Sequence, residues 1–140
     1  MRDACDAHAA RAAERGLAFD VNIEGDVTVR ANRALLAKAL ANVVGNAVTY
    51  SPAGAHVSVR FAEGTLSVEN TGIALSADEV ARAFEPFYRA EASRNRATGG
   101  SGLGLYIVKT VLERYGMPFS LSSSDDCVTF QARLSKGRRI

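Results

Sequence analysis

The stretch Gly99-Gly100-Ser101-Gly102-Leu103-Gly104-Leu105-Tyr106-Ile107-Val108-Lys109 is the most informative part of this chain. Its glycines lack a Cβ, so backbone N–H groups in such a loop can approach an anion closely. From Leu105 to Leu112 the apolar residues recur at helical spacing, which predicts a helix that ends near Tyr115. A helix that opens directly after a glycine loop points its positive end at the loop, which suits a phosphate. Taken alone, the same pattern is equally typical of a flexible surface turn.

The length and composition indicate a single globular domain. The 140 residues are 47% hydrophobic and 23% charged, and the formal net charge is +2. These values are ordinary for a soluble protein and argue against a dedicated nucleic-acid binder. The sequence contains neither an apolar run of membrane-spanning length nor a signal-peptide pattern. Cys5 and Cys127 lack metal-ligand spacing, which predicts two reduced thiols.

The rest of the chain alternates between helical and strand-like segments. Asn32 is a good N-cap for a long helix, and Ser76 with Glu79 forms a capping box. Residues 90–101 are polar and aperiodic and predict a mobile loop. The predicted helices are 3–15, 33–49, a short one after Ser76 and the one that ends near Tyr115; the predicted strands are 17–23, 27–29, 57–61, 66–68, 119–123 and 128–134. This order predicts an α+β fold with helices on one face of a mixed sheet.

The predicted helix 33–49 carries two amides four residues apart. Asn42 and Asn46 therefore share one face, beside an apolar stripe that includes Leu40 and Val43. Buried amides need partners, because an unpaired buried polar group is costly. Two interpretations remain open at this point. The amides either bond neighbouring loops or offer oxygen ligands to Mg²⁺ together with phosphates and water.

Four segments together resemble the catalytic ATP-binding domain of bacterial sensor histidine kinases. The helix with the two asparagines is similar to the N box of that family, and Glu69-Asn70-Thr71-Gly72-Ile73-Ala74-Leu75 stands where the family has its first glycine box. Phe84-Glu85-Pro86-Phe87-Tyr88-Arg89 resembles the F box, and the opening stretch resembles the second glycine box. The resemblance covers nearly all of residues 1–136. It implies a two-layer α/β sandwich, the Bergerat fold, whose mixed and mostly antiparallel sheet is covered on one face by about three helices, with a flexible ATP lid.

The resemblance also implies roles for individual residues. Asn46 would coordinate Mg²⁺, while Asn42 would support the phosphate end of the same site. Relatives that hydrolyse ATP have a glutamate at position 42, and an amide cannot act as a general base, so transfer to a histidine with slow hydrolysis is implied. Arg89 and Arg94 are candidates for contact with the γ-phosphate, although Arg94 equally fits a solvated loop. The implied catalytic residues are Asn42, Arg89 and Arg94, the implied metal ligand is Asn46, and the implied ATP contacts are Asn42, Asn46, Tyr50, Asn70, Gly72, Ile73, Arg89, Gly100, Ser101, Gly102, Leu103, Gly104 and Leu105.

Three positions depart from the family pattern. Asn70 replaces the aspartate that accepts a hydrogen bond from adenine, which costs about 1 kcal/mol if a charged bond becomes a neutral one. Ala74 replaces a glycine, so a positive φ there is in doubt. Thr49 stands where the family has Lys or Arg, so one phosphate-facing cation is expected to be missing. His8 lacks the phosphoacceptor pattern and is expected on a helix surface, and His56 is expected to be structural.

The sequence therefore predicts residues 1–140 to be one histidine-kinase catalytic domain, cut from a longer protein. The implied cofactors are ATP and Mg²⁺, and the implied partner is the dimerisation and histidine-phosphotransfer domain of the same protein, with a response regulator reached indirectly. The resemblance implies a membrane-anchored homodimer whose cytoplasmic part includes this chain, itself monomeric. Two alternatives stay open: a degenerate nucleotide-binding module that acts through protein contacts, and an anti-sigma-factor-type serine kinase of the same fold.

Overall fold

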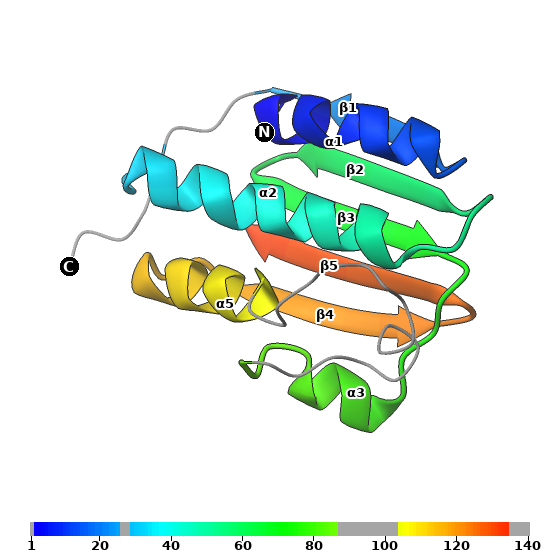
Figure 1. Ribbon diagram of the computed structural model, residues 1–140. Helices are drawn as coiled ribbons and strands as arrows, with labels where there is room; N and C mark the ends of the chain where they lie inside the picture. Colours follow the sequence, from blue (N-terminus) through cyan, green and yellow to red (C-terminus); the bar gives the residue numbers. More distant parts are fainter. Residues whose placement is uncertain (1, 26–28, 87–103, 135–140) are drawn as a thin grey trace.

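A five-stranded mixed sheet forms one layer of the molecule (Figure 1). The computed structural model describes residues 2–25, 29–86 and 104–134. The strand order is β1-β2-β3-β5-β4, with β1 parallel to β2 and the other neighbours antiparallel. The elements in chain order are α1 (Arg2–Glu14), β1 (Ala18–Ile23), α2 (Arg33–Tyr50), β2 (His56–Ala62), β3 (Thr65–Thr71), α3 (Ala77–Arg82), α5 (Gly104–Arg114), β4 (Phe119–Ser124) and β5 (Cys127–Arg133).

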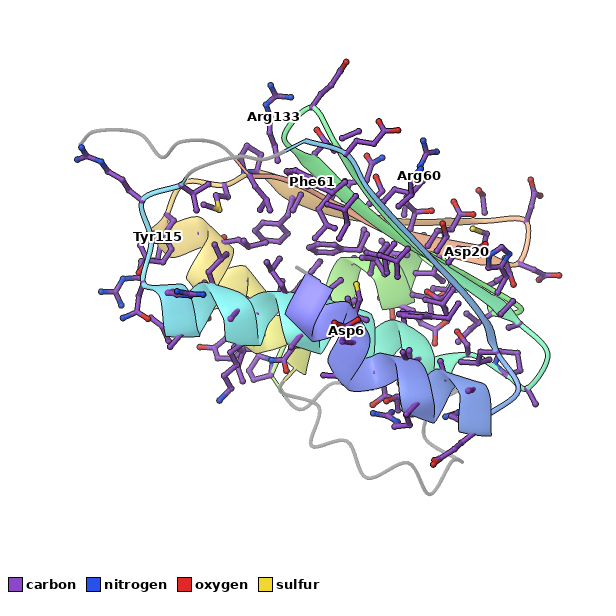
Figure 2. All side chains as sticks on the ribbon, turned by 90° about the horizontal axis from the view of Figure 1, so that it is seen from above. Asp6, Asp20, Arg60, Phe61, Tyr115 and Arg133 are labelled. Carbon is purple, nitrogen blue, oxygen red and sulfur yellow. The ribbon has the colours of Figure 1, made fainter. Side chains whose placement is uncertain are left out.

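Three helices, α1, α2 and α5, lie side by side on one face of this sheet, and α3 lies beyond β4 at its edge (Figure 1). Figure 2 shows Phe61 between the sheet and the helices, whereas Arg60 and Arg133 point away from them. The predicted α+β sandwich, with a mostly antiparallel sheet covered on one face by about three helices, is therefore confirmed.

The core lies between the two layers and follows from strand alternation. Every second residue of β2, β3 and β5 is buried, because successive side chains of a strand point to opposite faces. The register aligns Val59 with Val68 and Phe130 in the middle of the sheet. The next residue of β3 that faces the helices is Asn70, which is 7% exposed and is aligned with apolar residues on both neighbouring strands. A polar side chain thus occupies a core position at one end of β3.

Local sequence signals fix most of the element ends. Asn32 caps α2 by accepting the Leu35 N–H at 3.0 Å, and Ser76 and Glu79 form both bonds of the predicted capping box. The turn Glu63-Gly64, with φ values of 52° and 78°, closes the β2–β3 hairpin, and Asp125-Asp126 closes the β4–β5 hairpin in the same way. The predicted strand 27–29 is not confirmed: Val29 lies outside any strand, and residues 27 and 28 fall outside the described part.

Candidate functional site

Two amides of α2 meet the first residue of α5. Asn42 Nδ2 lies 3.5 Å from the Gly104 carbonyl oxygen, at the long limit of a hydrogen bond. A Cβ at Gly104 would lie 3.3 Å from both Oδ1 and Nδ2 of Asn46. The two helices approach this closely because position 104 is glycine. Within the described residues, the half-buried amide of Asn46 has no hydrogen-bond partner, so its oxygen is available to a ligand.

The start of α5 adds backbone N–H donors at the same place. A helix leaves its first N–H groups without intrahelical partners and carries partial positive charge there. The 11-residue helix α5 begins at Gly104, directly against the two amides. Oxygen acceptors from α2 and N–H donors from α5 therefore converge at one point, an arrangement that suits a phosphate together with a cation.

A buried amide without a partner marks the second part of the site. Asn70 faces the helix layer from β3 and is 7% exposed. Its backbone belongs to the sheet ladder, but none of the described residues offers its side chain a hydrogen bond. Leaving such a group unsatisfied costs about 1–3 kcal/mol. The other buried polar residues, Thr49 and Ser51, are both bonded within the protein.

The chain turns sharply after β3 against the end of α2. Gly72 has a φ of 80°, and a Cβ there would lie 2.7 Å from Pro52 Cγ and 3.4 Å from Ala55 Cβ. The Gly72 N–H donates to the Asp126 carbonyl oxygen at 2.8 Å. Ala74 lies outside the left-handed region, so the missing second glycine leaves the turn unstrained. The doubt about a positive φ at position 74 is thereby removed.

Three further predicted contact residues have less distinctive positions. Tyr50, the last residue of α2, and Ile73 are half-buried near this turn. Leu105 packs against the apolar core from the first turn of α5. Arg89, Arg94, Gly100, Ser101, Gly102 and Leu103, together with the predicted lid, lie outside the described residues.

Arg11 of α1 and Arg15, the residue that follows α1, reach the C-terminal end of α2, and sequence reasoning missed both. Arg11 Nη2 donates to the Thr49 hydroxyl. Arg15 donates to the carbonyl oxygens of Thr49 and Ser51, each at 2.6 Å. The expectation that a phosphate-facing cation is missing at position 49 stays a prediction, but a guanidinium from another helix contacts the threonine. Nothing in the sequence showed where α1 and the turn after it dock.

His8 is not the surface residue that the sequence predicted. Its ring packs on Gly45 of α2, where a Cβ would meet His8 Cε1 at 3.0 Å. Burial lowers the pKa of His8, and the nearby charge of Arg11 lowers it further, while a hydrogen bond with the backbone of Ala41 opposes the shift. The sequence could not show this contact, because it depends on how α1 docks on α2. His56 is structural as predicted, with its Nε2 2.5 Å from an Asp20 oxygen on the neighbouring strand.

Neither cysteine forms a disulfide. Both cysteines are free, Cys5 buried in α1 and Cys127 half-buried on β5, where burial raises the pKa of its thiol. Among the described residues, no group of three His, Cys, Asp or Glu side chains could hold a metal ion. A cation at this site would therefore depend on amide oxygens and on its ligand's own oxygens.

No helix within the described ranges has both the length and the apolar character that crossing a bilayer requires.

Comparison with known families places these features in context. Residues 31–138 match the family described as histidine kinase-, DNA gyrase B-, and HSP90-like ATPase. The chain is 39% identical over 115 residues to the sensor-like histidine kinase SenX3 of Mycobacterium tuberculosis, which covers 79% of this chain and 28% of that protein. It is 32% identical over 126 residues to the sensor protein VanSC of Enterococcus gallinarum, covering 88% of this chain and 35% of the relative. The chain thus spans about a third of these curated relatives.

Solved structures show the same architecture. The mycobacterial sensor histidine kinase MprB superposes with a TM-score of 0.76 at 28% identity, covering 100% of this chain and 97% of that one. The catalytic domain of histidine kinase ThkA superposes with a TM-score of 0.79 at 20% identity, covering 96% of this chain and 89% of that one, which shows the shared fold.

Proposed function

Because the chain belongs to the histidine kinase-, DNA gyrase B-, and HSP90-like ATPase family, we propose that it binds Mg-ATP and transfers the γ-phosphoryl group to a histidine of a partner domain. Family membership supports nucleotide binding directly. The named relatives are sensor kinases, which supports the histidine as acceptor and gives no support to a degenerate module or a serine kinase.

The phosphates fit the junction of α2 and α5. The N–H groups at the start of α5 would bind phosphate oxygens, and Asn46 would offer its amide oxygen to Mg²⁺. This cation usually takes only one or two protein ligands and completes its shell with phosphate and water. The Asn46 amide approaches Gly104 and has no partner among the described residues, which fits that requirement. The bound metal would neutralise charge on the phosphates.

The residue type at position 42 bears on whether the site can hydrolyse ATP. Its amide reaches Gly104 O, and an amide has no basic atom to take a proton from an attacking water. The site therefore holds the phosphates in position and lacks a general base at position 42 for hydrolysis. Such a site favours transfer to a nucleophile that another domain brings with it, since phosphoryl transfer depends mainly on positioning and on charge stabilisation.

The unsatisfied amide of Asn70 is the observation that carries the proposal. A 7%-exposed amide without a partner in the described protein is costly, and a ligand that bonds it would remove that cost. An amide can accept from the amino group of adenine and donate to a ring nitrogen. We place the base beside Asn70 and the turn at Gly72, with the phosphates at Asn46 and Gly104.

The test is Asn70→Leu, which replaces the amide by an apolar side chain with the same number and branching of heavy atoms. Nucleotide-free Asn70→Leu should be more stable than the natural chain by about 1–3 kcal/mol, because no buried donor or acceptor is left unsatisfied. ATP binding, measured by calorimetry, should weaken at least tenfold. The control Asn22→Leu, on the exposed outer side of β1, should change neither quantity. A destabilised Asn70→Leu that binds ATP normally would overturn the placement of the base.

The partners follow from the same proposal. The acceptor histidine belongs to a dimerisation and histidine-phosphotransfer domain of the full-length protein, which is a membrane-anchored homodimer with this domain on the cytoplasmic side. A response regulator then receives the phosphoryl group from that histidine; one structural neighbour is described as a histidine kinase in complex with its response regulator protein. Acid-labile and base-stable labelling of the full-length protein by γ-labelled ATP tests the acceptor. Acid-stable label would point to a serine.

A further inference from the structure

We infer that Arg11 of α1 binds the terminal phosphates of the nucleotide, so that α1 supplies a cation that α2 itself does not carry. The inference rests on the proposed function, because it takes the phosphates to lie at Asn46 and Gly104. It concerns a helix outside the segments from which the sequence predicted nucleotide contacts.

The first observation is that the Arg11 guanidinium is half-buried and poorly satisfied. It donates to one neutral acceptor, the Thr49 hydroxyl. No carboxylate of the described residues pairs with it. A guanidinium has five N–H donors in a planar fork, so most of them remain for another acceptor. Planar forks of this kind match phosphate oxygens in a bidentate manner.

The second observation is that Arg11 is not needed to cap α2. The last carbonyls of a helix carry partial negative charge and attract cations. Arg15 already serves them, since it donates to the carbonyl oxygens of Thr49 and Ser51 at 2.6 Å each. The two arginines therefore divide their contacts, with the helix end bound by Arg15 and the Thr49 side chain by Arg11.

The third observation is the position of Thr49 relative to the phosphate end of the site. Thr49 follows Asn46 at i + 3 and Asn42 at i + 7, so all three share one face of α2. Residues at i and i + 3 have Cβ atoms about 5–6 Å apart. The Thr49 hydroxyl that Arg11 contacts therefore stands one helical turn from Asn46, on the face of α2 that carries both asparagines. Figure 1 shows the C-terminal ends of α1 and α2 next to one another.

The chemical consequence is tighter binding of the charged end of the nucleotide. A fixed guanidinium at the terminal phosphates would offset the charge that spreads over their oxygens during transfer. It would add nothing to the binding of adenosine, which lacks phosphates. The contribution of Arg11 is therefore separable from that of Asn70 by the choice of ligand.

The test compares ATP, ADP and adenosine binding to the 140-residue chain and to Arg11→Gln. A charged hydrogen bond accounts for about 10- to 100-fold in affinity, so ATP binding should weaken by that factor while adenosine binding stays unchanged. Arg15→Gln is the matched control: it should lower the melting temperature and leave the ratio of ATP to adenosine affinity unchanged. Adding Thr49→Lys to Arg11→Gln should recover part of the lost ATP affinity, because the ammonium group would occupy the place of the guanidinium.

The outcomes separate the two proposals. If the natural chain binds neither ATP nor adenosine, the proposed function fails. If the natural chain binds ATP and the ratio of ATP affinity to adenosine affinity is the same in Arg11→Gln as in the natural chain, Arg11 does not contact phosphate and the inference is wrong. An equal loss of ATP and adenosine binding would assign Arg11 to the fold alone and would also overturn it. Should Arg11→Gln fail to fold, Arg11→Lys decides: a fall in the ratio of ATP to adenosine affinity supports the contact, because an ammonium group cannot make a bidentate contact with phosphate, and an unchanged ratio refutes it.

Discussion

Replacing Gly72 by alanine should destabilise the folded chain through two separate costs. The first is conformational, because φ is 80° at this residue and a left-handed backbone costs a residue with a Cβ about 1–2 kcal/mol. The second is steric. The new Cβ would lie 2.7 Å from Pro52 Cγ and 3.1 Å from Pro52 Cδ, and a proline ring cannot rotate away. Overpacking of this kind costs about 1–3 kcal/mol, so the total is about 2–5 kcal/mol.

A second glycine isolates the conformational cost. Gly54 has a φ of 85°, but nothing lies within 4 Å of a Cβ built there. Gly54→Ala should therefore lose only about 1–2 kcal/mol. Urea unfolding of both variants, followed by circular dichroism, measures their free energies of unfolding. The extra loss in Gly72→Ala is the cost of the contact with Pro52. Adding Pro52→Ala to Gly72→Ala should recover that difference, since it removes both crowded ring atoms. Equal losses in the two glycine variants would refute the steric argument.

Two further predictions concern the amide of Asn46 at the phosphate end and the half-buried histidine His8. Asn46→Ala should abolish the Mg²⁺ dependence of ATP binding in calorimetry while the unfolding transition stays in place, because the apolar stripe of α2 is untouched; an unchanged Mg²⁺ dependence would remove Asn46 from the metal site. The unfolded chain should protonate His8 near pH 6.5, whereas the folded chain resists protonation because burial and Arg11 lower the pKa of His8. The free energy of unfolding should therefore fall as the pH drops from 7 to 5, and His8→Gln should flatten that fall in urea titrations at each pH. An equal slope in both chains would contradict this role.

Local signals in the sequence were sufficient for most of the fold. The cap at Asn32, the capping box at Ser76 and the two hairpins depend on residues a few positions apart, so their energetics act before any tertiary contact forms. The strand alternation of β2, β3 and β5 fixed which face is buried, because the side-chain period of a strand is two. Asn42 and Asn46 were found for the same reason, since their spacing is a property of one helix.

The sequence could not show which groups meet across elements. That the Asn70 amide has no partner among the described residues became visible only when the sheet register placed it between two buried valines under the helix layer. Gly45 looks like an ordinary helix position in the sequence and Gly104 like the end of a glycine loop, and only the packing shows that His8 and Asn46 approach them. The contact of Arg11 with Thr49 joins residues 38 positions apart. Its existence depends on the angle and register at which α1 docks on α2, which many weak packing contacts set together and no local pattern records.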